Sequence, residues 1–271
     1  MRRSPSAPAP HDVVDRARYP VDALGSDDGR ALVDACRARL AADGACELPA
    51  FLSAAATEYL AREAIALAPL AHHSCVEGTV YLDLPDESAP DGHPRRVIGP
   101  NAVGAVAYDL FPADSGIRAV YAWLALRDFV AACLHVERVH PYADPFGALN
   151  LAVMRAGDEL AWHFDQTDFV VSIALASAEQ GGDFEFVPRI RRPDDECEDD
   201  VAAVLAGDRT RVRRLPMTPG TLLLFEGRYS LHRVTPIRGD TPRLVALLAY
   251  DTKPGTVSTP LLRGVRYGRE A

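Results

Sequence analysis

The stretch Trp162-His163-Phe164-Asp165 places an imidazole and a carboxylate two residues apart in a strand-like segment. In a β-strand, residues i and i+2 point to the same face of the sheet. His163 and Asp165 can therefore hold one metal ion while Phe164 points the other way into packing. A surface His beside a solvated Asp gives the same triplet, so the pattern needs a third ligand before it indicates a site.

A later segment supplies a candidate for the third ligand. Residues 218–225 are typical of a turn followed by a buried strand, which leads to His232. Two His and one carboxylate form a triad with open coordination positions, which is typical of non-haem Fe(II) oxygenases.

The next strand, 242–250, is apolar except for Arg243 near its start. Because an unpaired guanidinium is costly to bury, we expect Arg243 to meet an anion there. A dicarboxylate co-substrate would supply one through a bidentate contact.

The order His163-x-Asp165, His232 and then Arg243 resembles the Fe(II)/2-oxoglutarate-dependent dioxygenase superfamily, over about residues 148–250. Between these residues, Gly181-Gly182-Asp183-Phe184-Glu185-Phe186 resembles the Gly-Gly strand of prolyl hydroxylase-like members. The resemblance implies that His163, Asp165 and His232 hold Fe(II). It also implies that Arg243 binds the far carboxylate of 2-oxoglutarate, with dioxygen as the second co-substrate and ascorbate as a supporting reductant. Asn150 fits either a contact to 2-oxoglutarate or a contact to an amine or polar head group of the substrate.

The residues around the ligands, 160–168 and 225–233, also look like the branch of free-amino-acid radical halogenases and their hydroxylase relatives. In the halogenases a small residue replaces the carboxylate, and halide enters its coordination site. Asp165 fills that position here, so the resemblance implies hydroxylation and not halogenation.

The chain as a whole predicts a mainly β protein with helices. Its many short strands fit a double-stranded β-helix, the jelly-roll or cupin-like core, with N-terminal helical support. We expect a disordered tail at 1–18 and a single domain at 19–271, comprising helical support at about 19–140, a core barrel at about 145–252 and an insertion at 188–216. The expected local elements are a helix from Ser26 to Gly44, a strand at 45–51, a helix at 53–67, a strand at 81–84 and a helix at 117–136; little pattern follows 253.

Four further residues are candidate substrate contacts. Arg95 and Arg96 could bind a carboxylate, and Asp168 could receive an amine or polar head group. Trp162 fits either a packing residue or a wall of the substrate site. For the arginines, the alternative is a solvated surface position.

Two other segments are ambiguous. The insertion at 188–216 fits a solvated charged face or a lid over substrate. The cluster His72, His73 and Cys75 fits a partly exposed loop or strand end better than a metal site.

Composition narrows the partners. The formal net charge is -9 and no block of basic residues occurs, so we expect a small-molecule substrate and not nucleic acid. The five cysteines are scattered without a Cys-x-x-Cys, which favours a reducing cytoplasm. No apolar run reaches membrane-spanning length and no signal peptide is evident; the oligomeric state stays open.

The favoured function is hydroxylation of an unactivated C–H bond in a small polar metabolite, a free amino acid or a derivative. One alternative is a peptidyl, prolyl-type hydroxylase, which needs an open groove for an extended chain. Another is a non-catalytic jelly-roll protein that binds or senses metal. Arg243 argues against it, because a sensor needs no clamp for a co-substrate.

Overall fold

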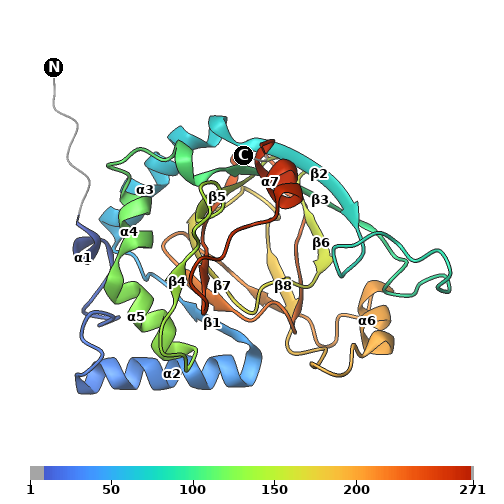
Figure 1. Cartoon of the computed structure of the whole chain (residues 1–271), viewed down its shortest axis with the longest axis horizontal. Helices are drawn as coiled ribbons and strands as arrows, with labels where there is room; N and C mark the ends of the chain where they lie inside the picture. Colours follow the sequence, from blue (N-terminus) through green and yellow to red (C-terminus); the bar gives the residue numbers. More distant parts are fainter. Residues whose placement is uncertain (1–8, 270–271) are drawn as a thin grey trace.

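One large antiparallel sheet curves into a barrel at the centre of the molecule (Figure 1). The computed structural model describes residues 9–269. The sheet has 11 strands in the order β1-β10-β7-β12-β5-β3-β6-β11-β8-β9, and β2 pairs with β3 outside this path. This architecture confirms the predicted jelly-roll core.

Thirteen strands occur in residues 9–269, and β4 and β13 form a pair separate from the large sheet. The strands are β1 (Ala45–Leu48), β2 (His72–Gly78), β3 (Gly99–Val106), β4 (His140–Pro141), β5 (Leu149–Met154), β6 (Leu160–His163), β7 (Val170–Ala176), β8 (Phe184–Val187), β9 (Arg213–Leu215), β10 (Leu222–Phe225), β11 (Leu231–Val234), β12 (Arg243–Leu248) and β13 (Tyr250–Asp251).

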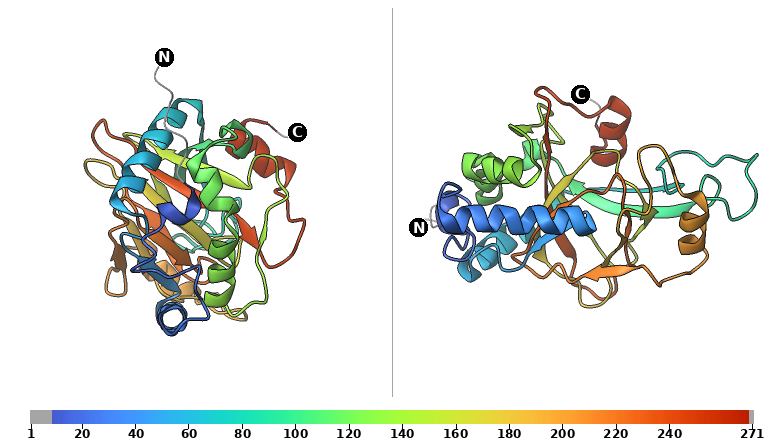
Figure 2. Two further views of the ribbon diagram at one scale, coloured as in Figure 1. Left: turned by 90° about the vertical axis from the view of Figure 1, so that its left-hand side faces the viewer. Right: turned by 90° about the horizontal axis from the view of Figure 1, so that it is seen from below.

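The helices lie outside the barrel. Those from the first half of the chain gather on one side of it, whereas α6 lies on the other side and α7 lies beside β2 and β3 (Figures 1 and 2). The helices are α1 (Pro10–Val13), α2 (Asp27–Asp43), α3 (Ala54–Leu67), α4 (Gly116–Ala122), α5 (Leu124–Cys133), α6 (Glu198–Leu205) and α7 (Pro260–Tyr267), with 3-10 turns at Ala68–Leu70 and Tyr108–Leu110.

The first long helices begin and end at the predicted signals. The hydroxyl of Ser26 accepts a hydrogen bond from the Gly29 N–H at the start of α2, and the hydroxyl of Ser53 caps α3 in the same way. Gly44 ends α2 with a φ of 65°, a left-handed conformation that glycine adopts without steric cost.

Successive side chains of a strand point alternately into the barrel interior and toward the layer beneath the helices. On β5, Leu149, Leu151 and Val153 belong to the hydrophobic cluster shared with the helices, whereas Ala152 and Met154 belong to the interior cluster. Residues i and i+2 share a face of a strand, so Asn150 also points into the barrel.

Part of the segment expected as an N-terminal tail is structured. Residues 1–8 of that expected segment lie outside the described residues. From Pro10 onward the chain is ordered, because Val13 and Val14 are buried and Val14 bridges to Leu52.

The single helix expected at 117–136 is wrong. The structure has α4 and α5, separated at Trp123, whose backbone is extended. Ile117 and Val120 would lie on the opposite face of a continuous helix from Phe129 and Cys133. The break allows both apolar faces to turn toward the same core.

Other local predictions also fail. Residues 81–84 form turns instead of a strand, and the neighbouring strands are β2 and β3. The segment containing His72, His73 and Cys75, by contrast, lies on the largely exposed strand β2, in line with the partly exposed loop or strand end that was favoured. Helix α7 was not predicted at all.

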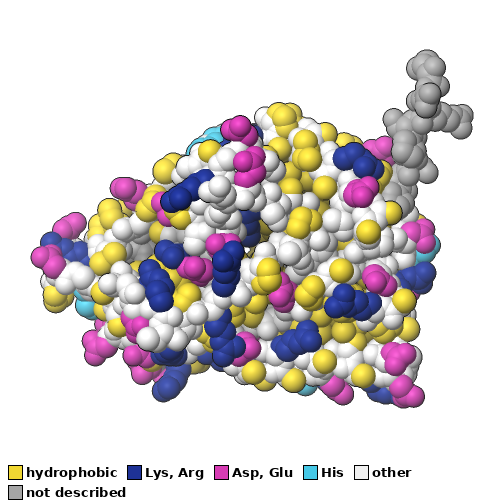
Figure 3. Space-filling model, turned by 180° about the vertical axis from the view of Figure 1, so that it is seen from behind, with side chains coloured by type: hydrophobic (Ala, Val, Ile, Leu, Met, Phe, Trp, Pro, Cys, Tyr) yellow, Lys and Arg dark blue, Asp and Glu magenta, His cyan; other side chains and the backbone are white. Residues whose placement is uncertain are grey.

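The surface mixes charges of both signs. The face seen in Figure 3 carries acidic and basic side chains close together, as expected from the many arginine–carboxylate ion pairs, of which Arg214–Asp183 is one. Within residues 9–269, no helix is both long and apolar enough to cross a membrane.

Asp144 fastens the C-terminal segment to the barrel. Its buried carboxylate accepts hydrogen bonds from the N–H groups of Phe146 and Gly147 at 2.8 Å, from that of Ser258 at 2.6 Å and from Arg263 Nε at 3.1 Å. Burial alone would raise the pKa of Asp144, but these donors outweigh it and lower the pKa to about 2. Since Ser258 and Arg263 flank the start of α7, this carboxylate positions that helix.

We predict that the stabilising effect of Asp144 disappears in acid. A carboxyl whose pKa is lowered by folding stabilises the folded state above its unfolded pKa, and this contribution is lost as the pH falls from about 4 toward 2. The free energy of unfolding of the wild type should exceed that of Asp144→Asn by about 2 kcal/mol more at pH 6 than near pH 2. Chemical denaturation across this range measures it. A difference in the free energy of unfolding that does not change with pH would contradict the prediction. Asp34→Asn, at an exposed position on α2, is the control and should change the free energy of unfolding by no more than about 0.5 kcal/mol.

Candidate metal centre

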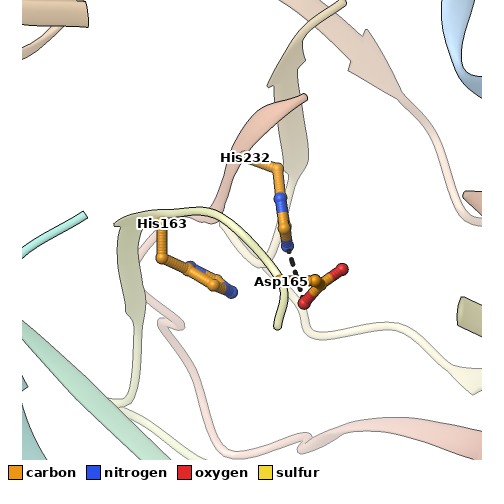
Figure 4. A group of neighbouring side chains, drawn as sticks. All are labelled: His163, Asp165 and His232. Atoms are coloured by element: carbon orange, nitrogen blue, oxygen red, sulfur yellow. Dashed lines mark ion pairs between the residues drawn. The ribbon is translucent and has the colours of Figure 1, made fainter. Parts of the chain in front are cut away.

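The structure brings together the three side chains that the sequence singles out. His163 ends β6, Asp165 follows two residues later, and His232 lies directly opposite His163 in the antiparallel pair β6–β11. The two imidazole rings are 4.2 Å apart between centroids, and Asp165 Oδ1 lies 3.5 Å from His232 Nε2 (Figure 4). One ligand atom from each residue lies within 4.8 Å of the other two.

Backbone carbonyls orient both imidazoles. His163 Nδ1 donates to the Ala161 carbonyl at 2.7 Å, and His232 Nδ1 donates to the Ser230 carbonyl at 2.9 Å. A proton on Nδ1 leaves the lone pair of Nε2 free, and each Nε2 points toward the other ligands (Figure 4). Fixing the tautomer through the second ring nitrogen is the usual arrangement around metal-ligating histidines.

The electrostatics also fit a divalent cation. Burial, followed by the neighbouring His232, lowers the pKa of His163 to about 4, so this imidazole is neutral at physiological pH. Burial raises the pKa of Asp165, but both histidines outweigh it and hold that pKa below its usual value. Neutral nitrogen beside an ionised carboxylate is the donor set of the two-His, one-carboxylate iron site.

Gly227 helps to position the Asp165 carboxylate, a role that the sequence did not reveal. Its carbonyl accepts the Asp165 N–H at 3.1 Å, and a Cβ added at this glycine would lie 1.8 Å from Asp165 Oδ2. The carboxylate therefore rests against bare backbone. The signal in the sequence was only a glycine between the β10 strand and His232, and nothing in that spacing identified its contact.

The outer face of the strands that carry the candidate ligands is packed by the insertion. Phe164 is buried, as predicted, and so is Trp162; both lie in a cluster with Val201 and Val204 of α6. The insertion thus packs, at least through α6, behind the ligand-bearing strands.

Arg191, also from the insertion, joins the two ligand-bearing segments. Its guanidinium lies 4.0 Å from the centre of the Phe164 ring, and its Nε donates to the Arg228 carbonyl at 2.6 Å. Glu196 neutralises it at 2.8 Å. Arg191 therefore links the segment with Asp165 to the segment with Gly227.

Arg243 lies buried at the first position of β12 without a carboxylate partner. Its Nη1 contacts Met154 Sδ at 3.9 Å, and within residues 9–269 it forms no ion pair. Burial lowers its pKa to about 10, which leaves it protonated at neutral pH. A cavity of about 240 Å³ reaches this side chain. Gly182 allows the close approach, because a Cβ there would lie 3.0 Å from Arg243 Cδ and 2.7 Å from Ile237 Cδ1.

Asn150 is a second buried polar residue inside the barrel, and its side-chain oxygen is unsatisfied among the described residues. Its Oδ1 is fully shielded and accepts no hydrogen bond from the described part of the chain. Buried polar atoms are rarely left unsatisfied in native proteins. The Oδ1 of Asn150 calls for a hydrogen-bond donor, whereas the buried guanidinium of Arg243 fits an anion inside the barrel.

The predicted substrate contacts mostly have partners within the chain. Arg95 pairs with Glu198 at 3.0 Å and Asp168 pairs with Arg228. Arg96 pairs with Asp91 at 3.0 Å. Trp162 follows the alternation of β6 and faces away from His163. Their roles in substrate binding stay predictions.

Comparisons with known proteins agree on the fold. The sequence model of the family described as "Halogenase D" matches residues 29–259. No curated protein sequence matches the chain.

Solved structures of similar fold include an oxidoreductase of the 2OG-Fe(II) oxygenase family from Burkholderia pseudomallei, with 16% identity and a TM-score of 0.52 over 83% of this chain and 92% of that one. The epimerase SnoN, in complex with Fe3+, alpha ketoglutarate and nogalamycin RO, has 17% identity and a TM-score of 0.55 over 82% and 84%. EctD from S. alaskensis, with 2-oxoglutarate and 5-hydroxyectoine, has 20% identity and a TM-score of 0.52 over 79% and 74%.

We predict that Gly227→Ala weakens metal binding. The added methyl group must displace the Asp165 carboxylate, so affinity for Co(II) or Mn(II) should fall roughly tenfold to a hundredfold, the range known for groups that orient metal ligands. Isothermal titration calorimetry of the metal-free protein measures this. Gly25→Ala is the matched control, because an added Cβ there meets no atom within 4 Å. Equal affinities for both variants would show that Gly227 does not position Asp165.

Proposed function

The chain belongs to the halogenase D family, and we propose that it acts as an Fe(II)- and 2-oxoglutarate-dependent hydroxylase of a small polar metabolite, a free amino acid or a derivative. The observation that carries this proposal is the carboxylate of Asp165 beside His163 and His232. In radical halogenases of the resembling branch, a small residue leaves that position to halide. Here Asp165 fills it, which supports hydroxylation.

The residues that would hold the metal lie at one end of the barrel, and the residue that would hold the far carboxylate of the co-substrate lies at the other. When bound, Fe(II) with 2-oxoglutarate and dioxygen supplies the oxidising power to hydroxylate an unactivated C–H bond, with release of succinate and carbon dioxide. His163, Asp165 and His232 would hold the metal. Arg243 would hold the far carboxylate of 2-oxoglutarate through a bidentate contact, and the Asn150 amide would meet a polar atom of the same molecule.

The surroundings favour chemistry protected from water. Phe184 and Phe225 lie 5.6 and 4.9 Å from the His232 ring, and they contact each other edge to face at 5.0 Å. These rings wall the centre with apolar surface, which excludes water and limits side reactions.

A small substrate fits the barrel better than an extended chain does. Tyr267 of α7 is buried against Ala105, Ala107 and Phe146 beside the barrel interior. A helix at this position leaves less room for a bound peptide, which supports a metabolite over a peptidyl residue.

The test is a screen of amino acids and their derivatives with Fe(II), 2-oxoglutarate and saturating chloride. We expect succinate and a product that gains one oxygen atom derived from dioxygen, with no chlorine isotope pattern in its mass spectrum. A chlorinated product would refute the hydroxylase assignment. His163→Ala is the control and should form no product, because the metal loses a ligand.

We predict a separate effect for Arg243→Met, which keeps an apolar stem and removes the charge. The Michaelis constant for 2-oxoglutarate should rise roughly tenfold to a hundredfold, the value of losing a charge-assisted contact. Steady-state succinate formation at varied 2-oxoglutarate measures it. Arg214→Met is the control, since Arg214 lines the same cavity but is exposed and paired with Asp183. An unchanged constant for Arg243→Met would remove this arginine from co-substrate binding.

A further inference from the structure

Helix α7 covers the interior of the barrel at one end. On β3, Val103 faces the interior cluster, and Ala105 and Ala107 continue along the same face. Tyr267 packs on these two alanines and on Phe146. The helix therefore lies over the continuation of the barrel interior, beside β2 and β3 (Figures 1 and 2).

The metal centre lies at this same end. Phe225 at the end of β10 pairs with Val170 at the start of β7. The loop that carries Asp165 enters β7 here, and the loop that carries Gly227 leaves β10 here. Strand β5 also begins at this end, since Leu149 pairs with the last residue of β12, and Phe146 lies just before it. Helix α7 and the candidate iron ligands therefore border one opening.

Three arginines of the C-terminal segment recur at every third position, and two of them have acidic partners. Arg263 pairs with Asp144 at 3.1 Å, and Arg269 forms a bidentate pair with Asp109 at 2.7 and 2.8 Å. Arg266 lies between them and is partly buried. Within residues 9–269 it forms no ion pair, hydrogen bond or cation–π contact. Arg266 is therefore a partly buried cation to which the described residues offer no anion.

The charge of Arg266 acts on the metal centre. Burial is the largest influence on the pKa of His163 and of Asp165, and Arg266 is among the smaller ones that lower both. Arg266 thus places a positive charge on the helix that borders the same opening as the candidate ligands, which fits an anionic group of a molecule bound there.

The far carboxylate of 2-oxoglutarate does not compete for this arginine. Arg243, its proposed partner, pairs in register with Met154 at the opposite end of β5 from Leu149. Arg95 and Arg228 are already paired with Glu198 and Asp168. Arg266 is therefore available to a second anion at the α7 end of the barrel.

We propose that Arg266 is the residue that binds the substrate carboxylate, at the opening between α7 and the metal centre. This inference rests on the proposed function and names the side chain that recognises its substrate. It assigns recognition to a helix outside the barrel and not to the arginines of the 79–98 loop.

The test compares each protein amino acid with its carboxamide, in which the carboxylate is replaced by a neutral group. Succinate formation above the substrate-free rate identifies accepted compounds. The wild type should prefer an acid over its amide. In Arg266→Gln the Michaelis constant for the acid should rise roughly tenfold to a hundredfold, and the preference should collapse. Arg269→Gln, on the same segment, should keep the wild-type preference, and the melting temperatures of both variants should confirm folding.

Three results would overturn the inference. The Arg266→Gln variant could keep the preference for acids, or the wild type could accept amides as well as acids. The third is that the enzyme forms succinate without substrate and no carboxylic acid raises that rate. Failure of the proposed function is recognised separately, because the wild type then makes no succinate under any condition. In that case calorimetric titration of the Mn(II)-loaded protein with the same acids and amides decides. Binding of an acid that is lost in Arg266→Gln supports the inference, and equal or absent binding rejects it.

Discussion

The pairing of β6 with β11 is the contact on which the site depends. It sets His163 opposite His232, and backbone carbonyls two residues before each ring hold the Nδ1 protons. Both imidazole rings are therefore already oriented before a metal ion binds. Preorganised ligands lose little conformational entropy on binding, and they leave Asp165 to complete the set from a loop braced by bare backbone at Gly227.

This pairing is supported from behind. Trp162 and Phe164 alternate with His163 and enter a cluster with α6, and Arg191 covers the Phe164 ring while bonding the Arg228 carbonyl. The insertion, with its run of acidic residues, thus contributes packing to the strands that carry the ligands. His163 points into the barrel, and its two sequence neighbours, Trp162 and Phe164, hold it in place by packing into the hydrophobic cluster on the outer side.

Charge is distributed along the barrel in a way that matches the proposed reaction. Arg243 is buried at one end without an ion pair in residues 9–269, and Arg266 is partly buried at the other, where the ligand triad lies. Elsewhere, arginines such as Arg95, Arg191 and Arg263 are matched by carboxylates of the chain. Cations left unmatched in partly buried positions favour anionic ligands, and their separation suits two different molecules.

The sequence by itself determined the parts that depend on short range. The spacing of His163 and Asp165 predicted that the two side chains meet, Ser26 and Gly44 bounded α2, and the apolar run around Arg243 predicted a buried cation. Asp165 itself lies in the loop after β6 and not in the strand that the spacing suggested. Local rules could not find β3, whose partners β5 and β6 lie about fifty residues further along the chain, or the break at Trp123, which follows from where the core lies. Only the tertiary structure placed Gly227 against Asp165, and α7 over the opening with an Arg266 that has no ion pair among residues 9–269. Contacts between segments distant in sequence arise from packing, and they leave no periodic signal in either segment.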